Sequence, residues 1–205
     1  MVKEEEDTES IIKNAEDTLK TAKWGLDLLK TENPYALPTG IRNVLTFGRA
    51  VTKVLQRLRS HESEFSAWYK PYRDEMENDP LLKYLYRIRN DVLKEGMMPV
   101  TSKMYISFLN SDWVNQLPKP PNTKGFFIGD NLGGSGFEIE LPDGSTEKLY
   151  IKLPWDTVIT SVHFKNLPKS HLGKSINGIP IKEICALYLQ YLEKVIKDAK
   201  GKFLD

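Results

Sequence analysis

Cysteine is nearly missing from the chain, since Cys185 is the single one among 205 residues. One cysteine cannot close an intramolecular disulfide, and it cannot supply a metal site built mainly of thiolate ligands. Proteins that rely on disulfides belong to oxidising compartments, so this usage is typical of a reducing one. We therefore expect a cytoplasmic protein with no metal and no other cofactor.

Long apolar runs are missing too, and none approaches the roughly 20 residues that a membrane-spanning helix needs. The first ten residues, MVKEEEDTES, are acidic and polar, whereas a signal peptide begins with a basic and then an apolar segment. A strong excess of one charge is also absent, because the formal net charge is +1. We expect no membrane partner, and any site for a polyanion must be a local patch of basic side chains.

The chain does contain an ordinary share of hydrophobic residues, 40%, which is enough for one large domain or two small ones. Through the first hundred residues, apolar side chains recur at three- and four-residue steps, which predicts helices. Asp79 is a natural N-cap for the last of them, Pro80 suits its first position and Gly96 ends it. The helices are expected at about 8–29, 41–60, 61–78, where Pro71 kinks or splits the helix, and 80–95.

After residue 98 the pattern changes to that of strands and turns. Short β-type runs occupy MYISFLN and GFFIGD, and DTVITSVHF is a further expected strand. The stretch GFEIELPDGSTEKLYIKLP predicts a β-hairpin with one buried face, because Phe137 and Ile139, like Leu149 and Ile151, alternate with polar residues around the turn PDGS. Residues 179–203 have the apolar spacing of an amphipathic helix.

The segregation of helices from strands predicts the α+β class. We expect an N-terminal antiparallel helical bundle at residues 1–98. A β-rich region at residues 99–205 follows, with a small antiparallel β-sheet and the C-terminal amphipathic helix. The sequence leaves open whether that helix returns to the bundle or covers the sheet.

A basic stripe marks the second expected helix, in which residues 41–60 contain no acid. At about 100° per residue, the side chains of Arg42, Arg49, Lys53 and Arg57 fall opposite the apolar ones. Such a stripe can follow a phosphate backbone. The segment that follows is acidic, however, so pairing between neighbouring helices or plain solvation explains the stripe as well.

Arg89 is the most informative residue of the fourth expected helix, because it projects at the edge of the core stripe. An arginine there lays its stem on apolar surface and needs acceptors for its guanidinium. It either ties two helices together through a carboxylate or serves a function. A cleft shared with Lys94 would indicate function, and a buried carboxylate partner would indicate structure.

The stretch RNDVLKEG, residues 89–96, resembles the RN…HEG motif of the HEPN superfamily, with Arg89, Asn90, Glu95 and Gly96 matching. HEPN proteins are helical-bundle RNases and nucleic-acid-handling proteins of toxin–antitoxin and phage-defence systems. The resemblance covers at most residues 8–96 and implies a homodimer. Lys94 stands where the superfamily has its histidine.

That departure bears directly on chemistry. Metal-independent RNA cleavage needs a group that accepts a proton near neutral pH, as imidazole does. A lysine, whose ordinary pKa is about 10.4, stays protonated and can only stabilise phosphate charge. The resemblance therefore implies a non-cleaving version in which Arg89, Asn90 and Lys94 contact phosphate or a partner. Arg49, Lys53 and Arg57 would aid them.

Three other motifs give weaker indications of function. HLGKSI ends like a P-loop, but Pro168 stands where that pattern needs its first glycine, which argues against nucleotide binding there. The glycine-rich residues 129–136 could contact a ligand closely. The pattern favours instead a flexible or tightly turning entry to the β-hairpin. His163, His171 and Cys185 match no metal-ligand spacing, so we expect structural roles for them.

No nucleophile–base pair is recognisable, so we expect no enzyme. Two further classes nevertheless stay open. The chain is a protein–protein interaction or scaffold module with no nucleic-acid role, or an enzyme whose ligand lies near Gly129–Gly136 or His163. The expected partners are accordingly RNA or another protein, together with a second copy of the chain.

Overall fold

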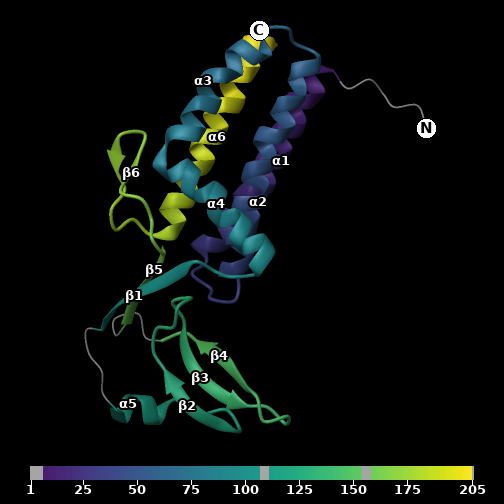
Figure 1. Cartoon of the computed structure of the whole chain (residues 1–205). Helices are drawn as coiled ribbons and strands as arrows, with labels where there is room; N and C mark the ends of the chain where they lie inside the picture. Colours follow the sequence, from purple (N-terminus) through teal and green to yellow (C-terminus); the bar gives the residue numbers. More distant parts are fainter. Residues whose placement is uncertain (1–6, 107–110, 154–157, 205) are drawn as a thin grey trace, which may run out of the picture. The chain divides into compact units, whose positions relative to one another are not determined.

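The computed structural model describes residues 7–106, 111–153 and 158–204 and confirms the expected α+β class. The chain forms two compact units. We call Met1–Pro99 with Asn166–Asp205 the helical unit, and Val100–Lys165 the β unit. Each unit is described by itself below (Figure 1).

The helical unit is a bundle completed by the end of the chain. The C-terminal helix packs against the first two helices and runs beside the third in Figure 1. The elements are α1 (Thr8–Lys30), α2 (Leu37–Leu55), the 3-10 helix η1 (Gln56–Ser60), α3 (Phe65–Asn78), α4 (Pro80–Glu95), the short strands β6 (Ser170–His171) and β7 (Lys174–Ser175), and α6 (Ile181–Phe203).

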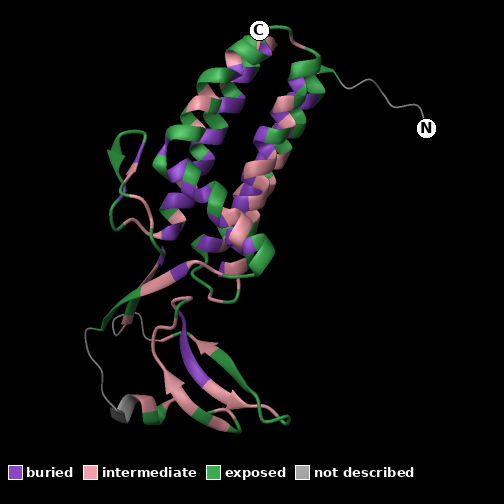
Figure 2. Cartoon of the chain, viewed as in Figure 1, coloured by how far each residue is buried: buried purple, intermediate pink, exposed green. Residues whose placement is uncertain are grey.

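The return of α6 to the bundle differs from the expected grouping of that helix with the β-rich region at 99–205. The expected boundary after residue 98 nearly coincides with the end of the first segment at Pro99. Ten residues of α6 are buried, from Ile181 to Ala199, so the helix needs apolar partners on a wide face. The inner faces of the bundle supply them, as the stretches coloured as buried along its helices in Figure 2 indicate.

Local sequence signals account for most helix ends. Asp7 caps α1 by accepting a hydrogen bond from the Ser10 N–H at 2.8 Å. Helix α2 begins four residues before the expected start at Ile41, because proline is tolerated in a first turn and Pro38 lies there. Its expected last turn, residues 56–60, tightens into η1. Helix α3 starts at Phe65 and is not split at Pro71.

Asp79 joins three segments of the helical unit. Its Oδ1 accepts hydrogen bonds from the Leu82 N–H at 2.9 Å, which caps α4, and from Nδ1 of His171 at 3.0 Å. Its Oδ2 accepts from the Leu172 N–H at 2.7 Å. Burial acts to raise the pKa of Asp79, but these three hydrogen bonds outweigh it and lower the pKa below its ordinary value. The β6–β7 hairpin is thereby fixed to the start of α4.

Helices α1 and α2 approach each other closely at two glycines. A Cβ on Gly40 would lie 2.8 Å from the carbonyl oxygen of Gly25 and 2.7 Å from Cδ2 of Leu29. No side chain fits between the two backbones at this crossing. The apolar residues on either side can therefore interdigitate over the whole length of α1.

The β unit contains two small antiparallel sheets. One pairs β1 (Val100–Ile106) with β5 (Val158–Phe164), and the other has the order β2 (Thr123–Phe127), β3 (Ser135–Glu140), β4 (Thr146–Ile151). A short helix, α5 (Ser111–Gln116), lies between β1 and β2 in the chain. Residues 107–110 of the expected run MYISFLN and residues 156–157 of DTVITSVHF lie outside the described residues.

The expected hairpin is confirmed as β3–β4, with Phe137 opposite Leu149. Its burial differs from the expected single buried face, because Phe137 is 1% exposed and Leu149 is 38% exposed. Phe137 lies on the central strand and also contacts Phe126 of β2, with ring centroids 5.2 Å apart. Leu149 lies on an edge strand, which has a neighbour on one side only.

We expect Gly40→Ala to lower the free energy of unfolding by about 1–3 kcal/mol, because the added Cβ forces α1 and α2 apart. Urea unfolding followed by circular dichroism measures this change. Gly201→Ala is the matched control, since Gly201 is an exposed helical glycine near the end of α6. Alanine is the better helix former there and should not destabilise the chain. Equal losses in both variants would contradict the close approach at Gly40.

Asp79→Ala is expected to lower the free energy of unfolding by about 2 kcal/mol near neutral pH, because the α4 cap is lost and buried donors lose their acceptor. The folded pKa of Asp79 lies below its unfolded value near 3.8. Its contribution is therefore complete above that value and is lost as the pH falls through the folded pKa. The difference in the free energy of unfolding between variant and wild type, measured by urea unfolding, should narrow as the pH falls below 3.8.

Asp27→Asn is the control for that measurement, since Asp27 is an exposed α1 carboxylate paired with Lys30. Surface pairs of this kind contribute little, so this variant should unfold close to wild type at neutral pH. A gap for Asp79→Ala that stays constant over the pH range would contradict the proposed role of the carboxylate.

Candidate functional site

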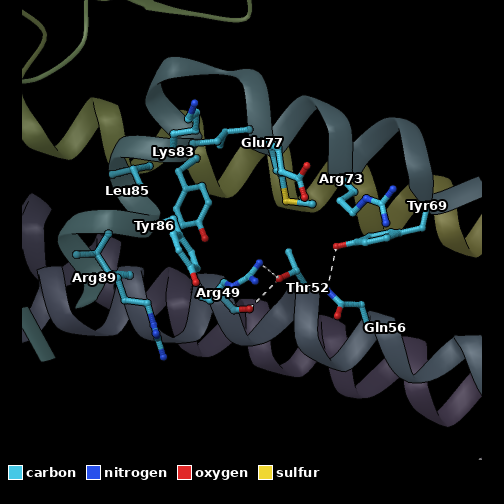
Figure 3. Close-up of a pocket in the computed structure, with 14 residues that line it drawn as sticks. Arg49, Thr52, Gln56, Tyr69, Arg73, Glu77, Lys83, Leu85, Tyr86 and Arg89 are labelled. Atoms are coloured by element: carbon cyan, nitrogen blue, oxygen red, sulfur yellow. Dashed lines mark hydrogen bonds between the residues drawn. The ribbon is translucent and has the colours of Figure 1, made fainter. Parts of the chain in front are cut away.

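A cavity of about 530 Å³ lies among α2, α3 and α4 of the helical unit (Figure 3). Each of these helices contributes a row of side chains three or four residues apart, which helical periodicity places on one face. The lining residues are Leu45, Arg49, Thr52 and Gln56 from α2 and η1; Tyr69, Arg73, Met76 and Glu77 from α3; Leu82, Lys83, Leu85, Tyr86 and Arg89 from α4; and Tyr188 from α6.

Positive charge dominates this lining. Arg49, Arg73, Lys83 and Arg89 are cationic, against the single carboxylate of Glu77. Arg73 has a nearby carboxylate outside the lining, with 3.7 Å between its Nη2 and Oδ1 of Asp74. Within the described parts of the chain, Arg49 and Arg89 form no ion pair. An anion in the cavity would meet positive charge that the protein leaves uncompensated.

Arg49 is held in place by two contacts. Its Nη1 donates a hydrogen bond to Oγ1 of Thr52 at 2.9 Å, and the Thr52 hydroxyl donates to the Arg49 carbonyl oxygen at 2.9 Å. Its guanidinium carbon lies 5.1 Å from the centroid of the Tyr86 ring, which is cation–π geometry. The hydrogen bond and the Tyr86 ring appear together in Figure 3. The Arg49 charge is therefore fixed at the boundary between α2 and α4.

Arg89 is only partly satisfied. Its Nη1 donates to Oδ1 of the neighbouring Asn90 at 3.1 Å. Its Nε is buried and has no hydrogen-bond partner, and among the described residues it is the one buried side-chain atom in that condition. A buried donor without an acceptor costs about 1–3 kcal/mol. The protein thus maintains one buried nitrogen without an acceptor, in a residue whose side chain also lines the cavity.

Tyr188 closes the cavity from α6. A Cβ on Gly48 would lie 2.5 Å from Cε1 of Tyr188, so the glycine gives the ring its space. Burial raises the pKa of Tyr188 well above its ordinary value, although the charges of Arg49 and Arg89 act in the opposite direction. Tyr188 is therefore a neutral phenol in the cavity lining.

The structure brings together only some of the residues singled out from the sequence. Arg49 and Arg89 line one cavity, and Asn90 orients Arg89. Lys53, Arg57 and Lys94 are exposed and lie outside the lining. The environment of Arg89 matches neither expected alternative, because the hydrogen-bond partner of its guanidinium is the Asn90 amide and not Lys94 or a carboxylate.

Sequence analysis missed Arg73, Lys83, Tyr86 and Tyr188 as parts of a site. A local signal exists for three of them, since Tyr69, Arg73 and Met76 follow helical spacing, as do Lys83, Tyr86 and Arg89. Each row alone resembles an ordinary solvated helix face. Only the packing of three helices places the rows opposite one another.

The motifs of the other segments have structural explanations. Asp130 organises the glycine-rich loop, since its Oδ1 accepts from the N–H groups of Leu132 and Gly134 and its Oδ2 accepts from Tyr150 and Lys148. The P-loop-like residues form the β6–β7 turn, where Gly173 has φ 76°. Nε2 of His163 lies 2.9 Å from Oγ of Ser161.

Cys185 is buried, which raises the pKa of its thiol to about 12. In the part of the chain that the structure describes, no three or more His, Cys, Asp or Glu side chains are grouped to hold a metal ion. Nor does any described helix combine the length and apolar character needed to cross a membrane.

One comparison with known proteins gives a match, and it covers the helices of the cavity. The family model described as Bacteriophage lambda protein ea47 matches residues 23–134. This match spans more than half of the chain, so the chain belongs to that family. Every lining residue except Tyr188 falls inside the matched segment. Comparisons with curated proteins and with solved structures gave no match.

Arg89→Met is expected to leave the free energy of unfolding unchanged or to raise it by about 1 kcal/mol, because methionine keeps the apolar stem and removes a buried unpaired donor. Arg87→Met is the matched control on the exposed side of α4, where Arg87 lies over the Tyr84 ring at 5.5 Å. Thermal and urea unfolding compare the two variants. A clear loss of stability specific to Arg89→Met would show that Arg89 is a structural tie.

Proposed function

We propose that the chain is a non-catalytic RNA-binding module whose phosphate contact is centred on Arg49 and Arg89. The observation that carries this proposal is a cavity lined by four cations and one carboxylate, in which Arg49 and Arg89 form no ion pair with any described residue. Proteins retain such a destabilising arrangement where a ligand satisfies it. An anion with several oxygen acceptors is the ligand that fits.

Phosphate matches this site better than a single carboxylate does. Arginine presents a planar set of donors that binds phosphate oxygens through two parallel hydrogen bonds. Two arginines from different helices can engage one phosphate or two successive ones. The basic stripe continues past the cavity with Lys53 and Arg57, which are exposed on α2 and η1. A nucleic-acid strand offers phosphates at regular spacing for these cations.

We propose binding without cleavage, in keeping with the HEPN-like interpretation of residues 89–96. The described cavity lining includes no histidine, and Lys94 occupies the histidine position of the motif. The two polar residues of the motif contact each other, because Arg89 donates a hydrogen bond to Asn90 and the Asn90 amide orients the guanidinium. The homodimer and a separate protein partner stay predictions.

Binding of a fluorescent single-stranded RNA should weaken steeply as salt increases, because each neutralised phosphate releases counterions. Fluorescence anisotropy at several salt concentrations measures the slope of log affinity against log salt. Arg49→Ala and Arg89→Met should each lessen that slope by about 0.7. Lys53→Ala should weaken binding less, because Lys53 is exposed and lies outside the cavity.

Arg87→Ala is the matched control for these variants, since it removes an exposed arginine from the same helix as Arg89 without touching the cavity lining. It should leave the salt slope close to that of wild type. Absence of RNA binding at low salt would sink the proposal. Equal losses for Arg87→Ala and Arg89→Met would assign the binding to diffuse charge and not to this cavity.

A further inference from the structure

We infer that the cavity among α2, α3 and α4 binds a small aromatic carboxylate, with the carboxylate on Arg49 and the Tyr188 hydroxyl and the ring beside Tyr86. Such a site goes beyond the proposed function and does not depend on RNA binding. Tyr188, which has no role in the RNA contact proposed above, becomes a ligand-binding residue.

The Tyr188 hydroxyl is a polar group that the fold leaves without a partner. The side chain is 9% exposed, and its hydroxyl forms no hydrogen bond with any described residue. The Nε of Arg89 is the one described side-chain nitrogen or oxygen that is both fully buried and unpaired. The Tyr188 oxygen is therefore not fully buried, and it is open to the cavity that the side chain lines. A hydroxyl in this position can donate to a ligand or accept from one.

Helix α2 places this hydroxyl close to Arg49. A Cβ on Gly48 would lie 3.1 Å from the Tyr188 hydroxyl oxygen, so the oxygen lies against the α2 backbone one residue before Arg49. Among charged groups, Arg49 has the strongest effect on the pKa of Tyr188. Burial nevertheless raises that pKa, so the phenol keeps its proton and can donate a hydrogen bond to an anion. The hydroxyl and the guanidinium can therefore act on the same group of a ligand.

Arg49 retains an unused edge of its guanidinium. Its Nη1 donates to Thr52 at 2.9 Å, and its central carbon lies 5.1 Å from the centroid of the Tyr86 ring (Figure 3). Its Nε and Nη2 have no partner among the described residues, and neither is fully buried, in contrast to the Nε of Arg89. These two nitrogens form the side of a guanidinium that binds a carboxylate through parallel hydrogen bonds.

The size and the lining of the cavity favour a ligand that carries a ring. A volume of about 530 Å³ falls in the range of pockets that enclose whole small molecules, roughly 300–1,000 Å³. The lining includes apolar side chains, among them Leu45, Leu82 and Leu85. Tyr86 is 52% exposed although it lines the cavity, so its ring is open to a planar group. A ring that carries a carboxylate can cover these surfaces while its charge reaches Arg49.

The charge of the lining decides the sign of the ligand. Four cationic side chains line the cavity against the one carboxylate of Glu77. A cationic ring would meet an excess of like charge there. A neutral ring would leave the unused edge of Arg49 without an acceptor. An anionic ring satisfies both the charge and the donors.

The test uses small probes that displace a fluorescent dye. Anilinonaphthalene sulfonate, an aromatic anion that fluoresces in apolar surroundings, reports on occupation of the cavity. Benzoate carries both the ring and the carboxylate, whereas acetate carries the carboxylate alone and benzyl alcohol carries an uncharged ring. Benzylamine carries the ring with a positive charge. Calorimetric titration with benzoate measures its affinity directly.

Benzoate should displace the dye at least about fivefold more effectively than acetate, benzyl alcohol or benzylamine, because it alone supplies both the ring and the acceptor for Arg49. Tyr188→Phe should weaken benzoate binding at least about fivefold, since a hydrogen bond to a charged group is lost. Arg49→Lys should weaken it by at least about fivefold too, because the charge is kept but the planar edge is lost.

Two variants outside the lining are the matched controls. Tyr191→Phe removes the hydroxyl of another buried tyrosine of α6, and Arg42→Lys changes an exposed arginine of α2. Both should bind benzoate like wild type. Tyr188→Phe keeps the ring that packs on Gly48 and has no hydrogen bond to lose, so its midpoint of urea unfolding should equal that of wild type. A lower midpoint would make the hydroxyl a structural group and count against the inference.

Equal benzoate affinity in wild type, Tyr188→Phe and Arg49→Lys would overturn this inference. Acetate or benzyl alcohol that displaces the dye as well as benzoate would overturn it too. Salt-dependent RNA binding in a protein that does not bind benzoate would overturn the inference and leave the proposed function standing. Benzoate binding through Tyr188 in a protein that does not bind RNA would do the reverse.

Discussion

The carboxylate of Asp79 is the interaction on which the arrangement of the helical unit depends. It caps α4 through the Leu82 N–H and also binds the His171 imidazole and the Leu172 N–H of the β6–β7 hairpin. His171 lies 92 residues after Asp79 in the chain. One charged group thus fixes the start of α4 and the segment that leads into α6. The cavity residues from Leu82 to Arg89 follow directly on that capped turn, so their positions rest on it.

The cavity itself works against stability. Four cationic side chains line it against one carboxylate, and the buried Nε of Arg89 has no acceptor among the described residues. Such an arrangement persists because the surrounding helices are held by stronger means. Glycines let α1 and α2 come into backbone contact, and α6 buries a wide apolar face against the bundle. The cavity lining is therefore locally destabilising, and the well-packed helices around it hold it in place.

Membership of the Ea47 family and the cavity concern the same stretch of chain. The matched residues 23–134 contain α2, η1, α3 and α4, which supply all lining side chains but one. The exception, Tyr188, comes from α6 and needs Gly48 of α2 for its place. The cavity, whose other lining residues come from the matched residues 23–134, is thus completed by α6, which lies outside the match. The end of the chain is for this reason part of the unit that contains the cavity.

The sequence by itself determined those features that a few neighbouring residues decide. Asp79 and Gly96 bound α4, and PDGS turns the β3–β4 hairpin, because caps and turns depend on local backbone hydrogen bonds and on residues that adopt positive φ. The apolar spacing identified α6, and the Arg-Asn pair drew attention to Arg89. None of these signals reaches beyond a few turns.

Tertiary structure alone decided which faces meet. The apolar periodicity of α6 shows that this helix needs apolar partners, but it does not show that α1 and α2 provide them. The alternation of Leu149 with polar residues predicts a strand, but it does not show that this strand lies at the edge of its sheet. Helical periodicity places Arg49, Tyr86 and Arg89 on helix faces that, when each helix is considered alone, resemble faces exposed to solvent. The packing of three helices turns these surfaces toward one cavity, because contacts between distant segments follow from the whole core and not from spacing within a helix.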